Sequence, residues 1–149
     1  MIRKAKITDA AQIQALINHF ASQDVMLPRS LNAIYENIRD FWVFEDNKKV
    51  VACAALHVCW QDLVEIKSLA VSAGKQKLGI GRHLVMTCID EAKEMGAKKM
   101  FVLTYKPAFF KPFGFKRTTT KALPHKIWAE CIDCPKFPDC QEIAMIKSL

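Results

Sequence analysis

The sequence predicts an α/β fold of the α+β type, in which a mixed sheet of hairpin-connected strands lies beside helices. Two observations lead to this prediction. Apolar residues near the N-terminus recur at i, i+3, i+4 and i+7, as on the buried face of a helix. The middle of the chain carries runs of β-branched and aliphatic residues separated by short polar turns. The expected order is β-α-α-β-β-β-α-β-α-β-β, which is typical of a mixed sheet.

Helices are expected at four places. The first begins at Asp9, which has the spacing of a capping box with Gln12, and the second begins after the N-cap residue Ser30. The other two are expected over residues 82–95 and 108–113. The residues expected to face the core are Ile13, Leu16, Ile17 and Phe20 in the first helix, Leu31, Ile34, Tyr35 and Ile38 in the second, and Leu84, Cys88, Ala92 and Met95 in the third.

Strands are expected in the segments between and after these helices. They cover residues 2–7, 41–45, 50–60, 63–71, 99–105, a segment from residue 115 onward, and 142–147. Asp46, Asn47 and Lys48 form the turn that joins the second and third strands into a hairpin. The length of the chain suits one compact domain over residues 1–149.

Composition limits the classes of function. The hydrophobic fraction of 51% is enough for one core. No apolar stretch is long enough to cross a membrane, and the charged segment Met1–Lys6 lacks the hydrophobic block of a signal peptide, so we expect a cytoplasmic protein without membrane partners. The net charge of +7 favours polyanionic partners. Because no block of Lys or Arg and no zinc finger is present, we expect a phosphorylated cofactor rather than nucleic acid.

The most informative segment is the loop Gln76–Arg82, which reads QKLGIGR between a strand and a helix. Glycines let main-chain N–H groups approach a ligand closely, and a helix start offers unpaired donors and a positive dipole. Lys77 and Arg82 add positive charge. Such a loop is suited to a pyrophosphate, although an ordinary strand-to-helix turn fits the loop alone equally well. It matches neither the dinucleotide-binding pattern, because position 84 is Leu, nor a Walker A loop.

Three segments together resemble the GNAT acetyltransferases. Gln-x-x-Gly-x-Gly after a strand ending Ser-Leu-Ala-Val (68–71) resembles their acetyl-CoA signature. Residues 2–5 with 9–10 resemble their first strand and helix, and Phe109–Phe115 stands where the family has F-Y-x-x-x-G-F. The resemblance covers about residues 2–118. It implies the GNAT fold, with a central, mostly antiparallel sheet flanked by helices, and an enzyme that moves an acetyl group from acetyl-CoA to an amine.

A narrower resemblance concerns the acceptor. Leu27–Ser30 (LPRS) before a helix and Cys53–Leu56 (CAAL) in the hairpin are similar to the amino-acid N-acetyltransferases, the short relatives of N-acetylglutamate synthase. This implies a small amino acid as the amine substrate, with glutamate as first choice, and it allows a homodimer. Two other functions stay open: acetylation of a peptide or protein amine, and a GNAT-like module that binds coenzyme A or a partner without turnover.

The resemblance assigns the cofactor residues to two segments and one aromatic ring. They are Leu69, Ala70 and Val71, whose strand backbone pairs with the pantetheine arm; Gln76, Lys77, Leu78, Gly79, Ile80, Gly81 and Arg82, whose loop binds the pyrophosphate through main-chain amides; and Phe110. The side chains of Lys77 and Arg82 assist, or are ordinary solvated surface charges. The Phe110 ring packs against the cofactor or the core.

Glu65 is the candidate general base, because it stands just before the cofactor segment of the strand, where many relatives place one. A paired Glu, or one facing outward at a sheet edge, is an equally weighted alternative. Phe110 stands where many relatives carry a tyrosine and has no proton to give. Tyr105, a serine or threonine, or water therefore protonates the departing thiolate. The reaction without any acid is also chemically acceptable, since a coenzyme A thiolate is a tolerable leaving group.

Arg29 and Lys67 are the candidates for binding the acceptor. An arginine between a proline and a helix start presents a two-pronged guanidinium to a carboxylate. Lys67 shares a strand face with Glu65, because the two are two positions apart, and it neutralises a second carboxylate. A salt bridge between Lys67 and Glu65 is the favoured alternative.

The six cysteines fall into two groups. The first group lies in apolar stretches and is expected to form small, reduced core residues: Cys53, Cys59 and Cys88. The second group consists of Cys131, Cys134 and Cys140. Together with His125, these residues are enough to supply the four ligands of a tetrahedral zinc site. Because the spacing of the second group is irregular, we expect a reduced loop near the acceptor site and no bound metal.

Overall fold

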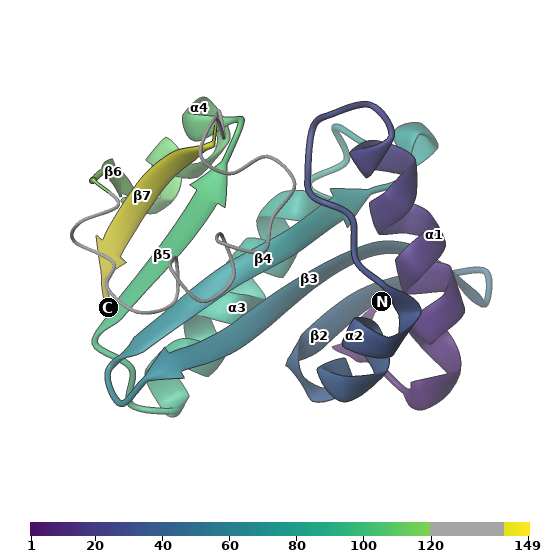
Figure 1. Ribbon diagram of the computed structural model, residues 1–149, viewed down its shortest axis with the longest axis horizontal. Helices are drawn as coiled ribbons and strands as arrows, with labels where there is room; N and C mark the ends of the chain where they lie inside the picture. Colours follow the sequence, from purple (N-terminus) through teal and green to yellow (C-terminus); the bar gives the residue numbers. More distant parts are fainter. Residues whose placement is uncertain (120–141) are drawn as a thin grey trace.

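The computed structural model describes residues 1–119 and 142–149, and these form a sheet of seven strands in the order β1-β2-β3-β4-β5-β7-β6 (Figure 1). The strands are β1 (Ile2–Lys4), β2 (Phe41–Asp46), β3 (Lys49–Trp60), β4 (Leu63–Val71), β5 (Lys99–Thr104), β6 (Lys116–Arg117) and β7 (Ile143–Ser148). Within this sheet β4 and β5 run parallel, and the other neighbouring pairs run antiparallel. The mixed, mostly antiparallel sheet that the sequence predicts is confirmed.

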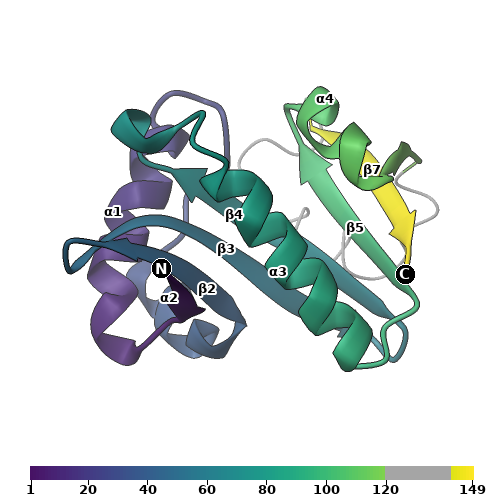
Figure 2. The same ribbon diagram turned by 180° about the vertical axis from the view of Figure 1, so that it is seen from behind.

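The helices cover both faces of this sheet. They are α1 (Ala10–Ala21), α2 (Leu31–Glu36), α3 (Ile80–Glu94) and α4 (Pro107–Phe110), with 3-10 turns η1 (Ile7–Asp9), η2 (Ile38–Asp40), η3 (Ala73–Lys75) and η4 (Lys111–Phe113). Figures 1 and 2 show α1 and α2 on one face, and α3 and α4 on the other. The order of the main elements along the chain is the predicted one.

The core follows the predicted helical faces with two exceptions. Ile13 and Ile17 of α1 are fully buried on one side of the sheet, and Leu84 of α3 is fully buried on the other. Tyr35 and Met95 were expected inside but are 46% and 55% exposed. Both lie at a helix end, where the face turns away from the sheet: α2 ends one residue after Tyr35, and Met95 is the C-cap of α3.

The predicted capping box between Asp9 and Gln12 is wrong. The Asp9 carboxylate instead accepts a hydrogen bond from the main-chain N–H of Lys6 at 2.7 Å, which closes the 3-10 turn before α1. Gln12 Oε1 accepts from the N–H of Val50 at 3.0 Å and so fastens α1 to β3. The predicted cap at Ser30 is confirmed, because its hydroxyl accepts from the N–H of Ala33 at 3.1 Å.

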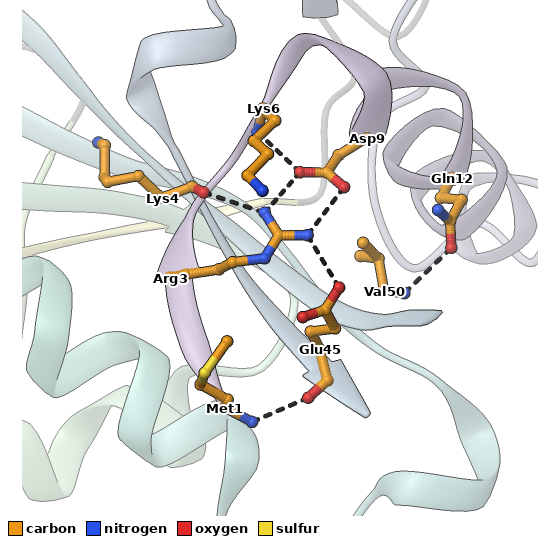
Figure 3. A network of polar contacts seen from close by, with 8 residues as sticks. All are labelled: Met1, Arg3, Lys4, Lys6, Asp9, Gln12, Glu45 and Val50. Carbon is orange, nitrogen blue, oxygen red and sulfur yellow. Dashed lines mark hydrogen bonds and ion pairs between the residues drawn. The ribbon is translucent and has the colours of Figure 1, made fainter. Parts of the chain in front are cut away.

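Asp9 is also the centre of an ion network at the N-terminus (Figure 3). Arg3 donates to its two carboxylate oxygens at 2.7 and 3.0 Å, and to Glu45 Oε1 at 3.2 Å. These bonds connect β1, the start of α1 and β2. The hydrogen bond from Arg3 holds the pKa of the Asp9 carboxyl below its usual value, and the same bond raises the pKa of Arg3.

The feature that positions the site is the separation of β4 from β5. Their register begins with Leu63 opposite Lys99 and ends with Glu65 opposite Phe101, although both strands continue beyond this point. Figures 1 and 2 show the two strands separating toward their carboxyl ends. A β-bulge lies in the separated part of β4, where Ser68 has a φ of +56°. The diverging ends of β4 and β5 are called the fork from here on. The fork opens toward the N-terminus of α3 (Figure 2).

Candidate active site

A cavity of about 700 Å³ occupies the fork between β4 and β5. This volume is within the range of small-ligand sites. Its lining includes every residue that the sequence predicted for the site except Leu78, whose side chain is 67% exposed. The structure therefore brings together residues that lie far apart in the sequence, such as Arg29, Glu65 and Tyr105. Their individual roles stay predictions.

The edge of β4 that faces the cavity suits an extended ligand. Ala70 and Val71 pair with β3 on one side, opposite Cys53 and Ala52. On the other side the pairing with β5 has already ended at Glu65. The main-chain groups of β4 beyond that point border the cavity, where an extended chain with amide groups can bind as an added strand.

The glycine loop ends in the first turn of α3. Gly79 is the N-cap and has a φ of +80°, a conformation that favours glycine, so the helix begins at Ile80 rather than at the predicted Arg82. The first intrahelical bond runs from His83 N to Gly79 O at 3.0 Å. The N–H groups of Ile80, Gly81 and Arg82 therefore have no intrahelical acceptor and point out of the positive end of the helix. This arrangement binds anions such as phosphates.

Side chains hold this loop in place and give it positive charge. Gln76 Nε2 donates to Val71 O at 3.1 Å, which ties the loop to the end of β4. Lys75 forms an ion pair with Asp46 at 2.8 Å, so its charge is already engaged by the β2–β3 hairpin. In the described part of the chain no carboxylate pairs with Lys77 or Arg82, both of which are exposed and line the cavity.

An aromatic group from α4 and η4 closes the cavity near the helix start. A Cβ placed on Gly81 would lie 3.5 Å from the Phe109 ring and 3.6 Å from Val71, which is ordinary contact, so a single methyl group fits there but a larger side chain would not. Phe109 packs edge-to-face on Phe110, with ring centroids 5.0 Å apart, and Phe110 packs in the same way on Phe115 at 5.5 Å. Phe110 is buried, so its ring belongs to the core as well as to the cavity wall.

Glu65 lies where the two strands begin to separate. It is only 4% exposed and belongs to a central strand, which excludes the edge-facing alternative. Its cross-strand partners are His57 on β3 and Phe101 on β5. Tyr105 follows the end of β5 and lines the same cavity, so the candidate base and the candidate acid come from the two strands of the fork.

Thr104 is a cavity residue that the sequence analysis did not single out. It is a buried polar residue at the end of β5, and its Oγ1 accepts a hydrogen bond from Lys106 N at 2.8 Å. The hydroxyl proton can therefore be donated to another acceptor. The signal available in the sequence was a hydroxyl residue beside Tyr105 at a strand end. The sequence analysis allowed for a serine or threonine donor but did not name Thr104.

The wall opposite the fork comes from the segment between α1 and α2. Arg29 is half-buried there, and its main-chain N–H donates to Asn18 Oδ1 at 3.2 Å. Gln14 Nε2 donates to Arg29 O at 3.5 Å, so α1 holds the segment at both points. The cavity is also lined by Phe20, which the sequence analysis expected in the core, and by Leu27 and Pro28 of the LPRS segment. Val25 and Met26 line it as well and were not named from the sequence.

The structure describes Cys53, Cys59 and Cys88, all of them as thiols. Cys53 and Cys88 are fully buried, and burial raises the pKa of each thiol to about 12, which keeps both neutral. This confirms the prediction of these two as small core residues, whereas Cys59 is only partly buried, against the cluster of Phe101 and Ala144. The zinc alternative cannot be compared with the structure, because His125, Cys131, Cys134 and Cys140 lie outside the described residues. Over residues 1–119 and 142–149 there is no group of three His, Cys, Asp or Glu side chains placed to hold a metal ion.

Comparison with known sequences then decides the family. A profile of the acetyltransferase (GNAT) family matches residues 9–115, which is most of the chain. The chain belongs to the GNAT acetyltransferase family. It is an acetyl-CoA-dependent N-acetyltransferase, as the cavity with its strand edge and anion-binding helix start suggests. Among the described residues, no helix of this GNAT protein is long and apolar enough to span a membrane.

Two relatives place the chain within the family. An uncharacterized N-acetyltransferase of Chlorobaculum tepidum is 40% identical over 99% of this chain and 96% of its own length. An amino-acid acetyltransferase of Mycobacterium tuberculosis is 36% identical over 77% of this chain and 67% of its own length. This GNAT protein is thus related to the amino-acid acetyltransferases.

A solved structure agrees with this relationship. N-acetylglutamate synthase of Neisseria gonorrhoeae, in complex with coenzyme A and N-acetyl-glutamate, superposes with a TM-score of 0.91 at 28% identity. The alignment covers all of this chain but only 35% of the synthase chain, so this GNAT protein spans about a third of that larger protein.

Proposed function

We propose that this GNAT enzyme acetylates the α-amine of a free amino acid, with glutamate as the first choice. The observation that carries the proposal is the composition of the cavity, in which the cations of Arg29 and Lys67 and the carboxylate of Glu65 line one space beside the strand edge of β4. Cations suit an acceptor that carries carboxylates, and the carboxylate suits removal of a proton from an amine. The amino-acid acetyltransferases among its relatives support the same reading.

Acetyl-CoA supplies the activated acetyl group, and the chain's part is to bind and orient it. The main chain of β4 from Leu69 to Val71 pairs with the pantetheine arm. The amides at the start of α3 bind the pyrophosphate, with Lys77 and Arg82 adding positive charge. The aromatic rings of α4 shield the cavity from water, which strengthens the electrostatic contacts inside it.

Glu65 takes a proton from the ammonium group of the acceptor, so that the amine has a lone pair with which to attack the thioester carbonyl. The new C–N bond forms as the C–S bond breaks, and the thiolate then needs a proton. Tyr105 is the proposed donor, because this residue follows the end of β5 and lines the same cavity. The second proton of the amine nitrogen then restores its hydroxyl group. Phe110 cannot serve, since its ring has no exchangeable proton.

Arg29 binds a carboxylate of the acceptor through its guanidinium, and Lys67 neutralises a second one. The main-chain contacts of Arg29 with α1 hold its backbone in place, so that only its side chain has to be ordered when the acceptor binds. We also propose that residues 1–149 act as a single catalytic domain. The Chlorobaculum relative supports this, because its alignment extends over nearly the whole of both chains.

The experiment is a panel of acceptors assayed for release of free thiol from acetyl-CoA. Free amino acids, with glutamate and glutamine among them, are compared with peptides that carry the same residue at the N-terminus. The proposal predicts that kcat/KM is highest for a free acidic amino acid. A preference for peptides would instead support the protein-amine alternative, and the absence of acceptor-dependent thiol release would support a binding module.

A further inference from the structure

A histidine–aspartate pair lies directly beside Glu65. His57 stands on β3 in register with Glu65 on β4, so the two side chains share one face of the sheet with their Cβ atoms about 5 Å apart. His57 Nδ1 lies 2.6 Å from Oδ2 of Asp40, the last residue of η2. Because a carboxylate only accepts hydrogen bonds, Asp40 holds the histidine proton on Nδ1 and leaves Nε2 as a basic nitrogen.

The proposed reaction requires a route for one proton. A protonated amine loses two protons on becoming an amide: the coenzyme A sulfur takes one, and the other must reach solvent in every turnover. Glu65 receives that proton but is only 4% exposed, and it lines a cavity that acetyl-CoA and the acceptor fill. The side chain of His57 is 29% exposed and that of Asp40 is 24% exposed, so the pair reaches from Glu65 toward water.

We propose that His57, held by Asp40, takes the proton from Glu65 and passes it to solvent, which restores the Glu65 carboxylate for the next turnover. The proposal rests on the proposed role of Glu65 as the base. The O–H bond of protonated Glu65 breaks as an N–H bond forms at Nε2 of His57. Asp40 stabilises the resulting imidazolium, which then loses one proton to water. His57 touches no substrate in this scheme and is a positioning residue.

His57→Gln is the variant that tests the proposal. The glutamine amide can still donate to Asp40, so the link between β3 and η2 is kept, but it cannot take up a proton. We expect kcat to fall by about tenfold or more, with the KM values for acetyl-CoA and glutamate changed less than about twofold. His19→Gln is the matched control, because His19 is an exposed histidine of α1 outside the cavity lining, and its kcat should equal that of the parent.

A double-mutant cycle separates proton transfer from a structural role. In the Glu65→Gln background no proton reaches His57, so adding His57→Gln should lower kcat no further. Asp40→Asn should show the same dependence on Glu65 with a smaller effect, and it serves as the second variant if His57→Gln does not fold. A kcat of His57→Gln within twofold of the parent, or equal losses in both backgrounds, overturns the proposal. Parent-like activity of Glu65→Gln would instead overturn the role of Glu65 itself, so the two failures are distinguishable.

Discussion

Replacing Asp9 with Asn should destabilise the protein by about 2 kcal/mol at neutral pH. Asp9 is buried and accepts three hydrogen bonds, two from the Arg3 guanidinium and one from Lys6 N. Asn keeps one acceptor oxygen, so it loses the charge and part of the bidentate contact. Hydrogen bonds to charged groups contribute about 1.5–3 kcal/mol each, and partial exposure of Arg3 to solvent lowers the net effect toward the smaller figure.

The pH dependence of this effect has a definite sign. The pKa of Asp9 is lowered in the folded protein, chiefly by the hydrogen bond from Arg3. Its contribution to stability is therefore fully present above the ordinary Asp pKa of about 3.9, and it is lost as the pH falls through the lower folded-state pKa. The difference in unfolding free energy between parent and Asp9→Asn should shrink in that acidic range.

Urea unfolding at pH 7 measures the difference directly, and a thermal scan should show a Tm lower by about 6 °C. Asp46→Asn is the matched control. Its carboxylate also contacts one cation, Lys75 at 2.8 Å, but the pair is exposed and screened by water. We expect that variant to unfold at nearly the same urea concentration as the parent. Equal behaviour of the two Asn variants at pH 7 would refute the reasoning about the Asp9 network.

Three further predictions concern the cavity. Gly81→Val should weaken acetyl-CoA binding by roughly tenfold or more in calorimetry, because the valine methyl groups would overlap Phe109 and Val71. Gly81→Ala is the control, because its single methyl group makes only ordinary contacts, and it should bind acetyl-CoA normally. Equal affinities of the parent and both variants would contradict the cofactor site. Arg29→Ala should raise the KM for glutamate about thirtyfold, the equivalent of about 2 kcal/mol, without changing the KM for acetyl-CoA, and Arg29→Lys should recover only part. An unchanged KM for glutamate would remove Arg29 from the acceptor site. Tyr105→Phe should lower kcat about tenfold at unchanged KM, and a parent-like kcat would show that another group or water protonates the thiolate.

Local patterns in the sequence were sufficient for most of the fold. The limits predicted for the central strand, residues 63–71, are those observed for β4, because apolar residues bounded by polar turns mark a buried strand. The cap at Ser30 depends on an N–H only three residues away, so local chemistry determines it. The buried positions of α1 follow from helical spacing in the same way.

The start of α1 shows why other details could not be predicted. Asp9 and Gln12 have capping-box spacing, but each finds a partner outside the helix: Arg3 for Asp9, and the main chain of Val50 for Gln12. The spacing of residues within one helix carries no information about such distant donors. The exposure of Tyr35 has a similar cause, since the pattern does not reveal that α2 ends at Glu36.

The candidate site was predicted only as far as its motifs reach. The glycine loop carries a local signal, which located the residues at the start of α3. The cavity itself arises because the parallel strands β4 and β5 stop pairing after Glu65 and Phe101, a tertiary feature with no local signature. For that reason the sequence analysis did not place Thr104, Val25 or Met26 in the site. It also included Leu78, whose exposed side chain does not line the cavity.

The most direct test of the proposed chemistry is the turnover of Glu65→Gln with glutamate, measured as thiol release from saturating acetyl-CoA. The amide keeps nearly the same size but cannot take a proton from the amine. We predict that calorimetry gives the parent affinity for acetyl-CoA and that kcat falls by about a hundredfold or more. A kcat equal to that of the parent, at equal cofactor affinity, would contradict the claim that this buried carboxylate at the fork of β4 and β5 is the base of an amino-acid acetyltransferase.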